Sequence, residues 1–559
     1  MRKIVMTRQA RSECLATSGS PNWLMLVRLT LLCVTAICGL KTTSADIRLP
    51  KIFSDSMVLQ RQAEVHVYGL ADPNEKLTIT LSGKDSEKKE LKTSCNPDGK
   101  FSVNFPPPPV GGPYELSIVG NASSVIIRDI LVGDVWLCSG QSNMEWPLSK
   151  SENGQVEVAA VDNPQLRFLT IEKTASPQPL EEFPGTLSWA NANPESAKNF
   201  PAVGFYFGQQ VQTEVNVPIG LINASWGGTL CEAWTSKDAL ASEPKLQKLV
   251  DFGESAADGS KKQDRHSFLF NGMISPLKTF PIKGVIWYQG ESNVGRGQQY
   301  SVLFPTMIND WRHQLHSPQM PFLFVQLAPF RYQNHLPIDL PELWEAQLNT
   351  LKHTPHTGMV VTTDLGNPED IHPVAKAQVG RRLATWAMAE VYGDQQLFPH
   401  PKQTSNDSTA TPNSSQTQAK VDSQPKAKPA SAEKPEAQTT DAAPKASKAP
   451  LYHGPIYKEF QVAGKKLVLH FHGQQQLSSS DNQPLREFSI AGDDHVFYPA
   501  QAVIMDGVIH VGSPEVTAPI AARFAWTDTP SANLVNETGM PASPFRTDDF
   551  PLNSVGKDY

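Results

Sequence analysis

Cysteine is scarce in this chain, which holds six among 559 residues. Three of the six fall within the first 45 residues, so Cys95, Cys138 and Cys231 remain in the rest of the chain. An odd number this small excludes a disulfide-rich scaffold and leaves at most one internal bridge. Cys138 and Cys231 lie beside two suspected active-site loops and are the candidates for that bridge. The alternative is that both are buried free thiols, which behave as small apolar side chains.

The chain also lacks a strong charge of either sign and, beyond residue 45, any long apolar run. Its formal net charge is −7, with 49 basic and 56 acidic residues, which gives no indication of a nucleic-acid partner. No segment after residue 45 is long and apolar enough to span a bilayer as a helix. We therefore expect neither nucleic acid nor a membrane to be a partner of this part of the chain.

The N-terminus differs from the rest of the chain. Basic residues precede an apolar segment at 23–40, and the small residues Thr43, Ser44 and Ala45 follow it. This order is typical of a signal peptide. An uncleaved anchor helix is the competing interpretation, but Arg28 leaves only about a dozen unbroken apolar residues, which is short for a span. We predict that residues 1–45 are a leader and that the protein is exported, to the periplasm or beyond.

Metal-ligand spacings are missing as well. The histidines do not combine with cysteines or carboxylates at the separations usual for zinc. We therefore expect no metal and no cofactor. The sequence gives no indication of the oligomeric state.

Apolar patterning divides the chain after the leader into four parts. Residues 46–130 hold short runs of alternating polarity between Gly- and Pro-rich turns, which indicates a small β-sandwich-like domain. Residues 131–400 alternate apolar runs with helical patterns. Residues 401–450 are rich in Pro, Ala, Lys and Ser and almost free of aliphatic side chains, so we predict a disordered insertion. Residues 451–559 return to strand patterns and predict a C-terminal β module packed on the preceding domain.

The second of these parts, residues 131–400, carries five apolar runs that each end in polar or glycine-rich residues. These runs are 135–138, 217–222, 284–288, 322–325 and 359–362. Helical patterns at 203–215, 300–315 and 376–392 lie among them. Continuously apolar strands that alternate with helices predict an α/β fold with a doubly wound parallel sheet, flanked here by small all-β modules. Because the carboxyl ends of parallel strands share one edge, we expect the polar residues after these runs to converge.

One of these strand ends has the sequence expected of a nucleophile turn. The apolar run 135–138 breaks into Ser139, Gly140, Gln141 and Ser142. A serine just past a buried strand faces a crevice while its backbone stays fixed. The alternative is an ordinary turn, since Ser, Gly and Asn are common turn residues.

A serine nucleophile needs a base, and the last strand end supplies a histidine. His372 follows the run 359–362 in a loop, and it is the candidate base for Ser142. A carboxylate must then orient the imidazole and stabilise its cation. Asp370, Glu369 and Asp364 are all near in sequence. Asp370 ranks first and Glu369 second, because a spacing of two or of three residues could each orient the ring.

Two further strand ends offer donors for an oxyanion. Gly227 or Gly228 presents a bare backbone N–H, and the side-chain amide of Gln289 or Asn293 adds a second donor. Together with Ser142 and His372, these residues predict a serine-hydrolase site assembled from segments more than two hundred residues apart.

At these residues the chain resembles a known family. GQSNMEWPL, WGGT, WYQGESN, and DIHP followed by a Lys-x-x-x-Gly-Arg-Arg-Leu helix are similar to motifs of the sialate O-acetylesterase family of SGNH-type hydrolases. The resemblance also takes in the final GMPASPFRTDDF. It implies that Ser142 is the nucleophile, that His372 is the general base and that Gln289 supplies the oxyanion amide. SGNH enzymes usually carry Asp three residues before the His, a position that Glu369 holds here, so the third triad member stays open.

The resemblance further implies a metal-free esterase that removes acetyl groups from sugar hydroxyls through an acyl-enzyme. Acetylated sialic acid is the expected substrate, with Arg296 and Arg331 as candidates to bind its carboxylate. The alternatives are an acetylxylan or other polysaccharide esterase, and a catalytically inactive carbohydrate-binding protein. Trp226, Trp234 and Trp287 are either sugar-stacking side chains or core residues.

Overall fold

A computed structural model describes residues 46–557 except 85, 122, 256–261, 394–451 and 474–475. The predicted leader, residues 1–45, and the predicted insertion, residues 401–450, lie outside the described residues.

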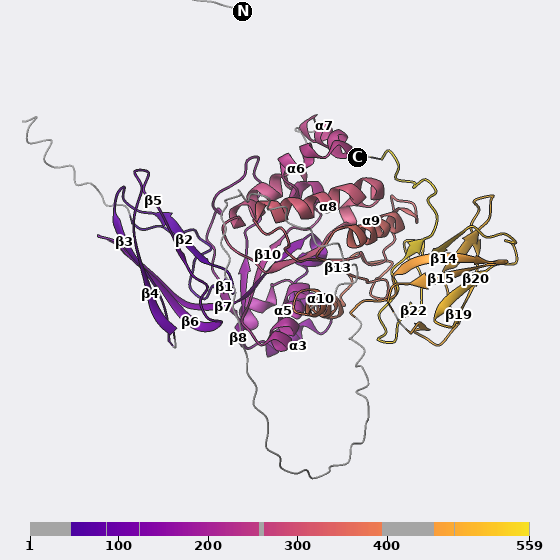
Figure 1. Ribbon diagram of the computed structural model, residues 1–559, viewed down its shortest axis with the longest axis horizontal. Coiled ribbons are helices and arrows are strands. Elements are labelled where there is room, and N and C mark those ends of the chain that lie inside the picture. The colour runs from indigo at the N-terminus through magenta and orange to yellow at the C-terminus, as the bar shows by residue number, and fades with distance from the viewer. Residues whose placement is uncertain are drawn as a thin grey trace, which may run out of the picture.

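The described chain forms three parts in a row, with an all-β part at each end of a central α/β part (Figure 1). The first two parts share one long strand, β7 (Ser124–Gly140), which begins in the N-terminal β part and ends in the middle of the central sheet. This strand passes without a break through the boundary expected between residues 130 and 131. From Gly133 to Gly140 it is buried throughout, as expected for a strand covered on both faces.

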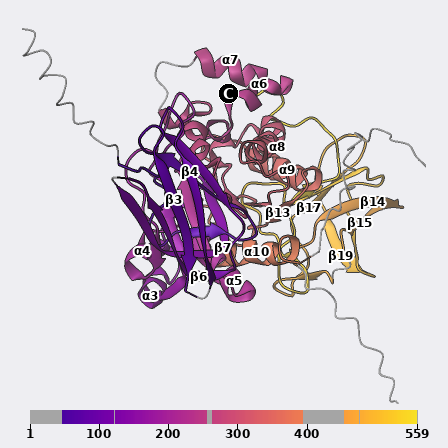
Figure 2. The same ribbon diagram turned by 60° about the vertical axis from the view of Figure 1, so that its left-hand side comes forward.

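The N-terminal part is built from short antiparallel strands whose apolar side chains alternate. In β3 (Lys76–Gly83), Leu77, Ile79 and Leu81 are buried while the side chains between them are half-buried. This period of two fits a sheet with one face on the core. The other strands of this part are β1 (Val58–Gln60), β2 (Val65–Leu70), β4 (Ser86–Ser94), β5 (Lys100–Phe105) and β6 (Gly111–Val119). Figure 2 shows β3, β4 and β6 side by side on the outer face of this part.

The central sheet has the strand order β13-β12-β11-β7-β10-β8-β9. Every neighbouring pair in it is parallel except β8 and β9. Its strands besides β7 are β8 (Asn163–Thr170), β9 (Ala190–Ala192), β10 (Ile219–Ser225), β11 (Gly284–Tyr288), β12 (Phe322–Val325) and β13 (Thr357–Val360). The predicted α/β architecture with a parallel sheet is confirmed.

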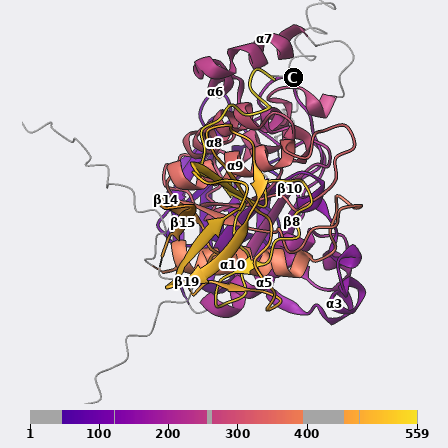
Figure 3. The same cartoon turned by 90° about the vertical axis from the view of Figure 1, so that its right-hand side faces the viewer.

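Helices cover both faces of this sheet. α5 (Ala202–Val215) and α10 (Lys376–Glu390) pack together below it, and α8 (Gly297–Gln314) and α9 (Asp339–His353) pack together above it (Figures 1 and 3). The shorter helices are α2 (Ser142–Glu145), α3 (Gly154–Ala160), α4 (Pro194–Lys198), α6 (Lys237–Ser242) and α7 (Gln247–Ser255). No helix within the described ranges has the length and apolar character that crossing a bilayer requires.

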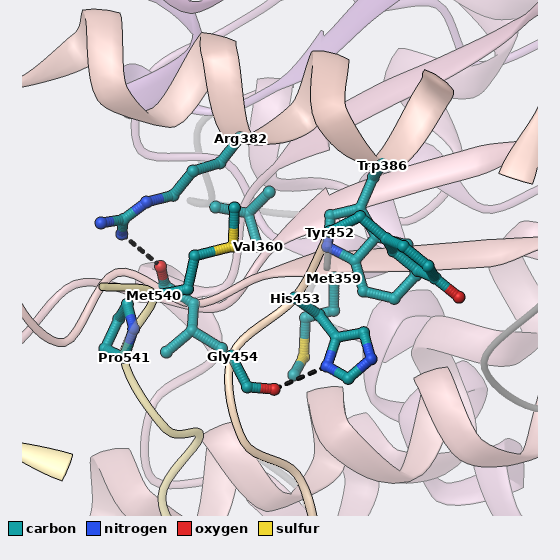
Figure 4. Close-up of a pocket in the computed structure, with 10 residues that line it drawn as sticks. Met359, Val360, Arg382, Trp386, Tyr452, His453, Gly454, Met540 and Pro541 are labelled. Carbon is teal, nitrogen blue, oxygen red and sulfur yellow. Dashed lines mark hydrogen bonds between the residues drawn. The ribbon is translucent and has the colours of Figure 1, made fainter. Parts of the chain in front are cut away.

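The C-terminal part has its own apolar core, separate from that of the other two. Its main strands are β14 (Tyr457–Ala463), β15 (Lys466–Phe471), β17 (Phe488–Ala491), β19 (Gln501–Met505), β20 (Val508–Gly512) and β21 (Ala521–Phe524). It meets the central part at a small cavity, where Trp386 of α10 and Met359 of β13 face Tyr452, His453 and Pro541 (Figure 4). The edge-on contact of Trp386 with Tyr452, at 4.9 Å between ring centroids, is part of this junction.

Candidate active site

Three strands of the central sheet end at the same level. Gly140, the last residue of β7, lies opposite Ser225 of β10 on one side and Tyr288 of β11 on the other. Ser225 and Tyr288 are themselves the last residues of their strands. The segments that follow the three strands therefore begin at the same edge of the sheet. Polar residues that are far apart in the sequence meet here for this reason.

The turn after β7 depends on a glycine. Gly140 has φ +133°, and a Cβ at this position would lie 2.2 Å from the carbonyl oxygen of Tyr288, so only glycine fits. Gln141 then bonds to the loop after β11: its backbone N–H donates to the Tyr288 carbonyl, and its Oε1 accepts from the N–H groups of Gly290 and Ser292. Ser142, the next residue, begins α2 from this fixed point.

The structure brings Ser142 and His372 together. The Oγ of Ser142 and the Nε2 of His372 are 2.8 Å apart, which is hydrogen-bond distance. His372 comes from the loop between β13 and α10, and its ring lies nearly parallel to the indole of Trp146, with 5.0 Å between centroids and 18° between planes. A serine hydroxyl in this position can pass its proton to the imidazole as it attacks a carbonyl carbon.

The three candidate carboxylates have different partners. Asp370 is the one beside His372: its Oδ1 accepts from the backbone N–H of His372 at 2.9 Å and lies 3.8 Å from Nδ1. Glu369 instead pairs with Arg331 and is 76% exposed, and Asp364 forms a two-point pair with Arg382. The geometry thus favours Asp370 over the other two as the charge that acts on the imidazole.

The environment of His372 favours its neutral form. Partial burial is the main cause that lowers the pKa of the imidazole, and the nearby ammonium of Lys376 lowers it further. The carboxylate of Asp370 opposes both effects and raises the pKa, but the net direction is downward. An imidazole that stays unprotonated at neutral pH has the form that a general base requires.

The glycine loop after β10 lies directly against the serine. A Cβ on Gly227 would lie 3.2 Å from the Cβ of Ser142, so a side chain there would crowd the nucleophile. The backbone N–H of Gly227 donates to Oε2 of Glu145 at 2.7 Å, and the other oxygen of Glu145 pairs with Lys173. Gly228 follows with φ +76° and open space around it. Gly227 is therefore placed at the serine, with its N–H held by a carboxylate, while Gly228 faces open space.

The two amide side chains are not directed at the serine. Both side-chain N–H groups of Gln289 are used, one by the Thr229 carbonyl at 3.1 Å and one by Oδ1 of Asn293 at 2.7 Å. Asn293 in turn donates to Glu232, and both amides are fully buried. They tie the loop after β11 to the loop after β10, so the geometry gives them a supporting place instead of the expected one in an oxyanion hole.

Two of the other expectations are settled by burial and bonding. Cys138 and Cys231 are both free buried thiols, so the disulfide considered between them is wrong. Burial raises the pKa of each thiol, as expected in an apolar setting. Trp234 and Trp287 are core residues that pack edge to face at 6.0 Å.

The third tryptophan and the two candidate arginines differ in exposure. Trp226 is half-buried, with the Lys173 ammonium 5.8 Å from its ring centroid, so it is the tryptophan of the three that still reaches the surface. Arg296 is held inside by Glu232, whereas Arg331 is 58% exposed on the same rim as the His372 loop.

Sequence reasoning missed five residues that line or support this site: Asn143, Glu145, Trp146, Glu291 and Lys376. Each lies within five residues of a predicted site residue and within the motifs quoted above. Their proximity was therefore available from the sequence, but the direction of their side chains was not. Among the described residues, no group of three or more His, Cys, Asp or Glu side chains is placed to hold a metal ion.

Comparison with known proteins points to one family. A sequence model described as "carbohydrate esterase, sialic acid-specific acetylesterase" matches residues 132–389. The sialate O-acetylesterase of Mus musculus is 30% identical over 417 residues, which cover 65% of this chain and 77% of that protein. The sialate O-acetylesterase of Homo sapiens is 30% identical over 387 residues, covering 64% of this chain and 73% of that protein.

A solved structure extends the similarity to nearly the whole described chain. The crystal structure of a carbohydrate acetylesterase from Xanthomonas citri superimposes with a TM-score of 0.74 at 34% identity, and covers 90% of this chain and 100% of that one. The likeness to this structure therefore reaches well beyond the part that the family model matches. The chain belongs to the sialate O-acetylesterase family of carbohydrate esterases.

Proposed function

We propose that this protein is a serine esterase that hydrolyses O-acetyl esters on carbohydrates, with acetylated sialic acid as its substrate. The observation that carries the proposal is the 2.8 Å approach of Ser142 Oγ to His372 Nε2 at the shared edge of three parallel strands. Membership of an esterase family supports the reaction type. An inactive binding protein would have no need of this pair.

In the proposed reaction, Ser142 attacks the acetyl carbonyl carbon while its hydroxyl proton passes to Nε2 of His372. The tetrahedral intermediate then collapses: the bond to the sugar oxygen breaks, and that oxygen takes the proton from His372. An acetyl group is left on Ser142. Water attacks this ester with His372 again as the base, and acetate leaves with the enzyme restored. Asp370 favours the imidazolium that forms in each half of the reaction.

For the oxyanion, we propose the backbone N–H groups of Ser142 and Gly227. Ser142 is the first residue of α2, so its N–H lies outside the hydrogen-bond pattern of the helix. Gly227 lies against Ser142, but Glu145 occupies its N–H. We infer that Glu145 leaves Gly227 when substrate binds and keeps its pairing with Lys173.

Arg331 is the proposed partner of the sialate carboxylate. Arg296, the other candidate, already neutralises the buried carboxylate of Glu232. Arg331 is exposed, and its backbone N–H bonds to Pro368 in the segment that leads to His372. A substrate carboxylate would replace Glu369 there in a charge-assisted hydrogen bond.

Acetate release in parallel assays tests the proposal. Purified protein without residues 1–45 is given 9-O-acetylated sialic acid, acetylated xylan and p-nitrophenyl acetate, with Ser142→Ala as the blank. Preference for the sialate, expressed as kcat/KM, is the expected result. Preference for xylan would keep the esterase and change the substrate, whereas no release from any of the three by folded protein would favour the binding-protein alternative.

We also propose that the protein acts after export, as the basic and apolar pattern of residues 1–45 indicates. The mass of the protein recovered from the cell exterior or periplasm tests this. A mature N-terminus near residue 46 is expected, whereas full-length protein retained in the membrane fraction would support the uncleaved anchor instead.

A further inference from the structure

A lysine that the proposed reaction does not use lies buried directly beneath the catalytic pair. Lys376 is the first residue of α10, four residues after His372, and none of its surface is exposed. Its ammonium lies 5.4 Å from the ring centroid of Tyr288 and 5.9 Å from that of Trp146, the ring that stacks on His372. A buried ammonium is costly unless it is hydrogen-bonded, so its partner deserves a functional explanation.

That partner is Asn143, the neighbour of the nucleophile. Nζ of Lys376 donates to Oδ1 of Asn143 at 2.5 Å. The Nδ2 group of Asn143 donates twice, to Oε1 of Glu291 at 2.5 Å and to the carbonyl of Ile371 at 2.9 Å. One amide therefore joins the turn that bears Ser142, the loop after β11 and the residue just before His372.

The ammonium also determines the orientation of the Asn143 side-chain amide. An ammonium group only donates hydrogen bonds and a backbone carbonyl only accepts them, so Oδ1 must face Lys376 and Nδ2 must face Ile371. Without the cation, Oδ1 has no donor, and only the two bonds from Nδ2 still hold the amide. The bond to Ile371, and with it the spacing between Ser142 and His372, would then be held less firmly.

We propose that Lys376 is a positioning residue: through Asn143 it locks the Ser142 turn to the His372 loop, and it places its ammonium beside the catalytic pair. The proposal rests on the proposed function, because it assumes that Ser142 and His372 carry the reaction. It deepens that function by adding a residue that touches no substrate.

The charges around the pair determine the direction of the effect. Lys376 faces Glu291 from the loop after β11, Asp370 and His372 from the preceding loop, and the Tyr288 ring from β11. Burial lowers the pKa of Lys376 to about 7, against the opposing effect of Glu291 and Asp370, so the lysine is a cation in the acidic range where His372 titrates. Loss of that cation would raise the pKa of His372, because burial alone would then oppose the carboxylate of Asp370.

The test is the pH profile of kcat/KM for p-nitrophenyl acetate in wild type, Lys376→Met and Lys376→Arg. Methionine keeps the unbranched apolar stem and removes the charge. We expect Lys376→Met to lower kcat about 10-fold or more with KM nearly unchanged, and to move the acid limb of the profile to higher pH by about half a unit or more. Lys376→Arg, which keeps a cation, should lower kcat but leave the acid limb where it is.

Lys150→Met is the matched control. The Lys150 ammonium lies 5.8 Å from the same Trp146 ring centroid, but the side chain is exposed. Neither kcat nor the acid limb should change in this variant. A Lys376→Met enzyme with the wild-type acid limb, or with wild-type kcat, would overturn the proposal.

Folding of the Lys376 variants and the activity of Ser142→Ala complete the test. If Lys376→Met does not fold, as judged by circular dichroism and thermal unfolding, wild-type kcat in the folded Lys376→Arg enzyme would overturn the positioning role. Ser142→Ala separates this inference from the function on which it rests. An inactive Ser142→Ala with an unchanged Lys376→Met would overturn the inference alone, whereas an active Ser142→Ala would overturn both.

Discussion

The Asp370 carboxylate lies 2.9 Å from the backbone N–H of His372 but 3.8 Å from the Nδ1 of the same residue. The second distance is too long for a hydrogen bond, so Asp370 acts on the imidazole through its charge and through the loop that it shapes. An aspartate bonded to Nδ1 in a serine-protease triad contributes about 10⁴ to kcat. We therefore expect a smaller loss here, with Asp370→Asn lowering kcat about 10- to 100-fold.

Glu369→Gln is the control for that variant. Glu369 pairs with Arg331 on the surface, so its loss should leave kcat for p-nitrophenyl acetate within about two-fold of wild type. A larger loss in Glu369→Gln than in Asp370→Asn would identify Glu369 as the residue that orients the ring.

The pH dependence should show a base with a low pKa. Burial and Lys376 together lower the pKa of His372 from 6.5, so the neutral imidazole persists into mildly acidic solution. The value of kcat/KM should therefore rise with pH and reach half its plateau below pH 6.5. Steady-state rates across the acidic range measure this, with Ser142→Ala reporting the uncatalysed rate. A midpoint above pH 6.5 would mean that the charge of Asp370 outweighs burial.

We expect the side chain of Glu145 to slow the reaction. Its carboxylate holds the Gly227 N–H and places a negative charge beside the proposed oxyanion. In Glu145→Gln the side-chain oxygen accepts a weaker hydrogen bond from the Gly227 N–H, and the negative charge is removed. The value of kcat/KM should therefore rise by about two- to ten-fold. Glu152→Gln, at an exposed residue, is the control. A fall in kcat/KM for Glu145→Gln would show that the carboxylate organises the glycine loop instead of blocking it.

We expect substitution of Arg331 to change KM only for substrates that carry a carboxylate. Arg331→Gln removes the proposed partner of the sialate carboxylate and should raise KM for 9-O-acetylated sialic acid about ten-fold, while KM for p-nitrophenyl acetate stays unchanged. Arg128→Gln is a control of similar exposure, 61% against 58%, in the N-terminal β part. Equal changes for both substrates would argue against a role in carboxylate recognition.

Much of this arrangement could be predicted from the sequence because parallel strands end at one edge. The runs 284–288 and 322–325 are strands with those same bounds, and the convergence of Ser142 with His372 follows from the strand pattern before any contact is known. β8 was not predicted because its apolar pattern is interrupted by Pro164 and Arg167. Arg167 is nevertheless buried, since Asp129 of β7 neutralises it.

Side-chain direction is where prediction from the sequence failed. The pattern placed Gln289 at the right edge of the sheet, but its amide turns to Thr229 and Asn293, because a buried amide must satisfy its own hydrogen bonds. The same limit concealed Lys376. A lysine at the start of an amphipathic helix is expected to be exposed. Its burial is explained by the hydrogen bond to Asn143 and by the nearby carboxylates of Glu291 and Asp370.

The most direct test of the account is the identity of the acetylated residue. The enzyme is mixed rapidly with p-nitrophenyl acetate, quenched in acid, digested and analysed by mass spectrometry. We predict an acetyl group on Ser142, absent in Ser142→Ala, which should also lose at least about 10³-fold in kcat while keeping the wild-type circular dichroism spectrum. An acetyl group trapped on another residue, or turnover by Ser142→Ala equal to that of the wild type, would contradict Ser142 as the nucleophile.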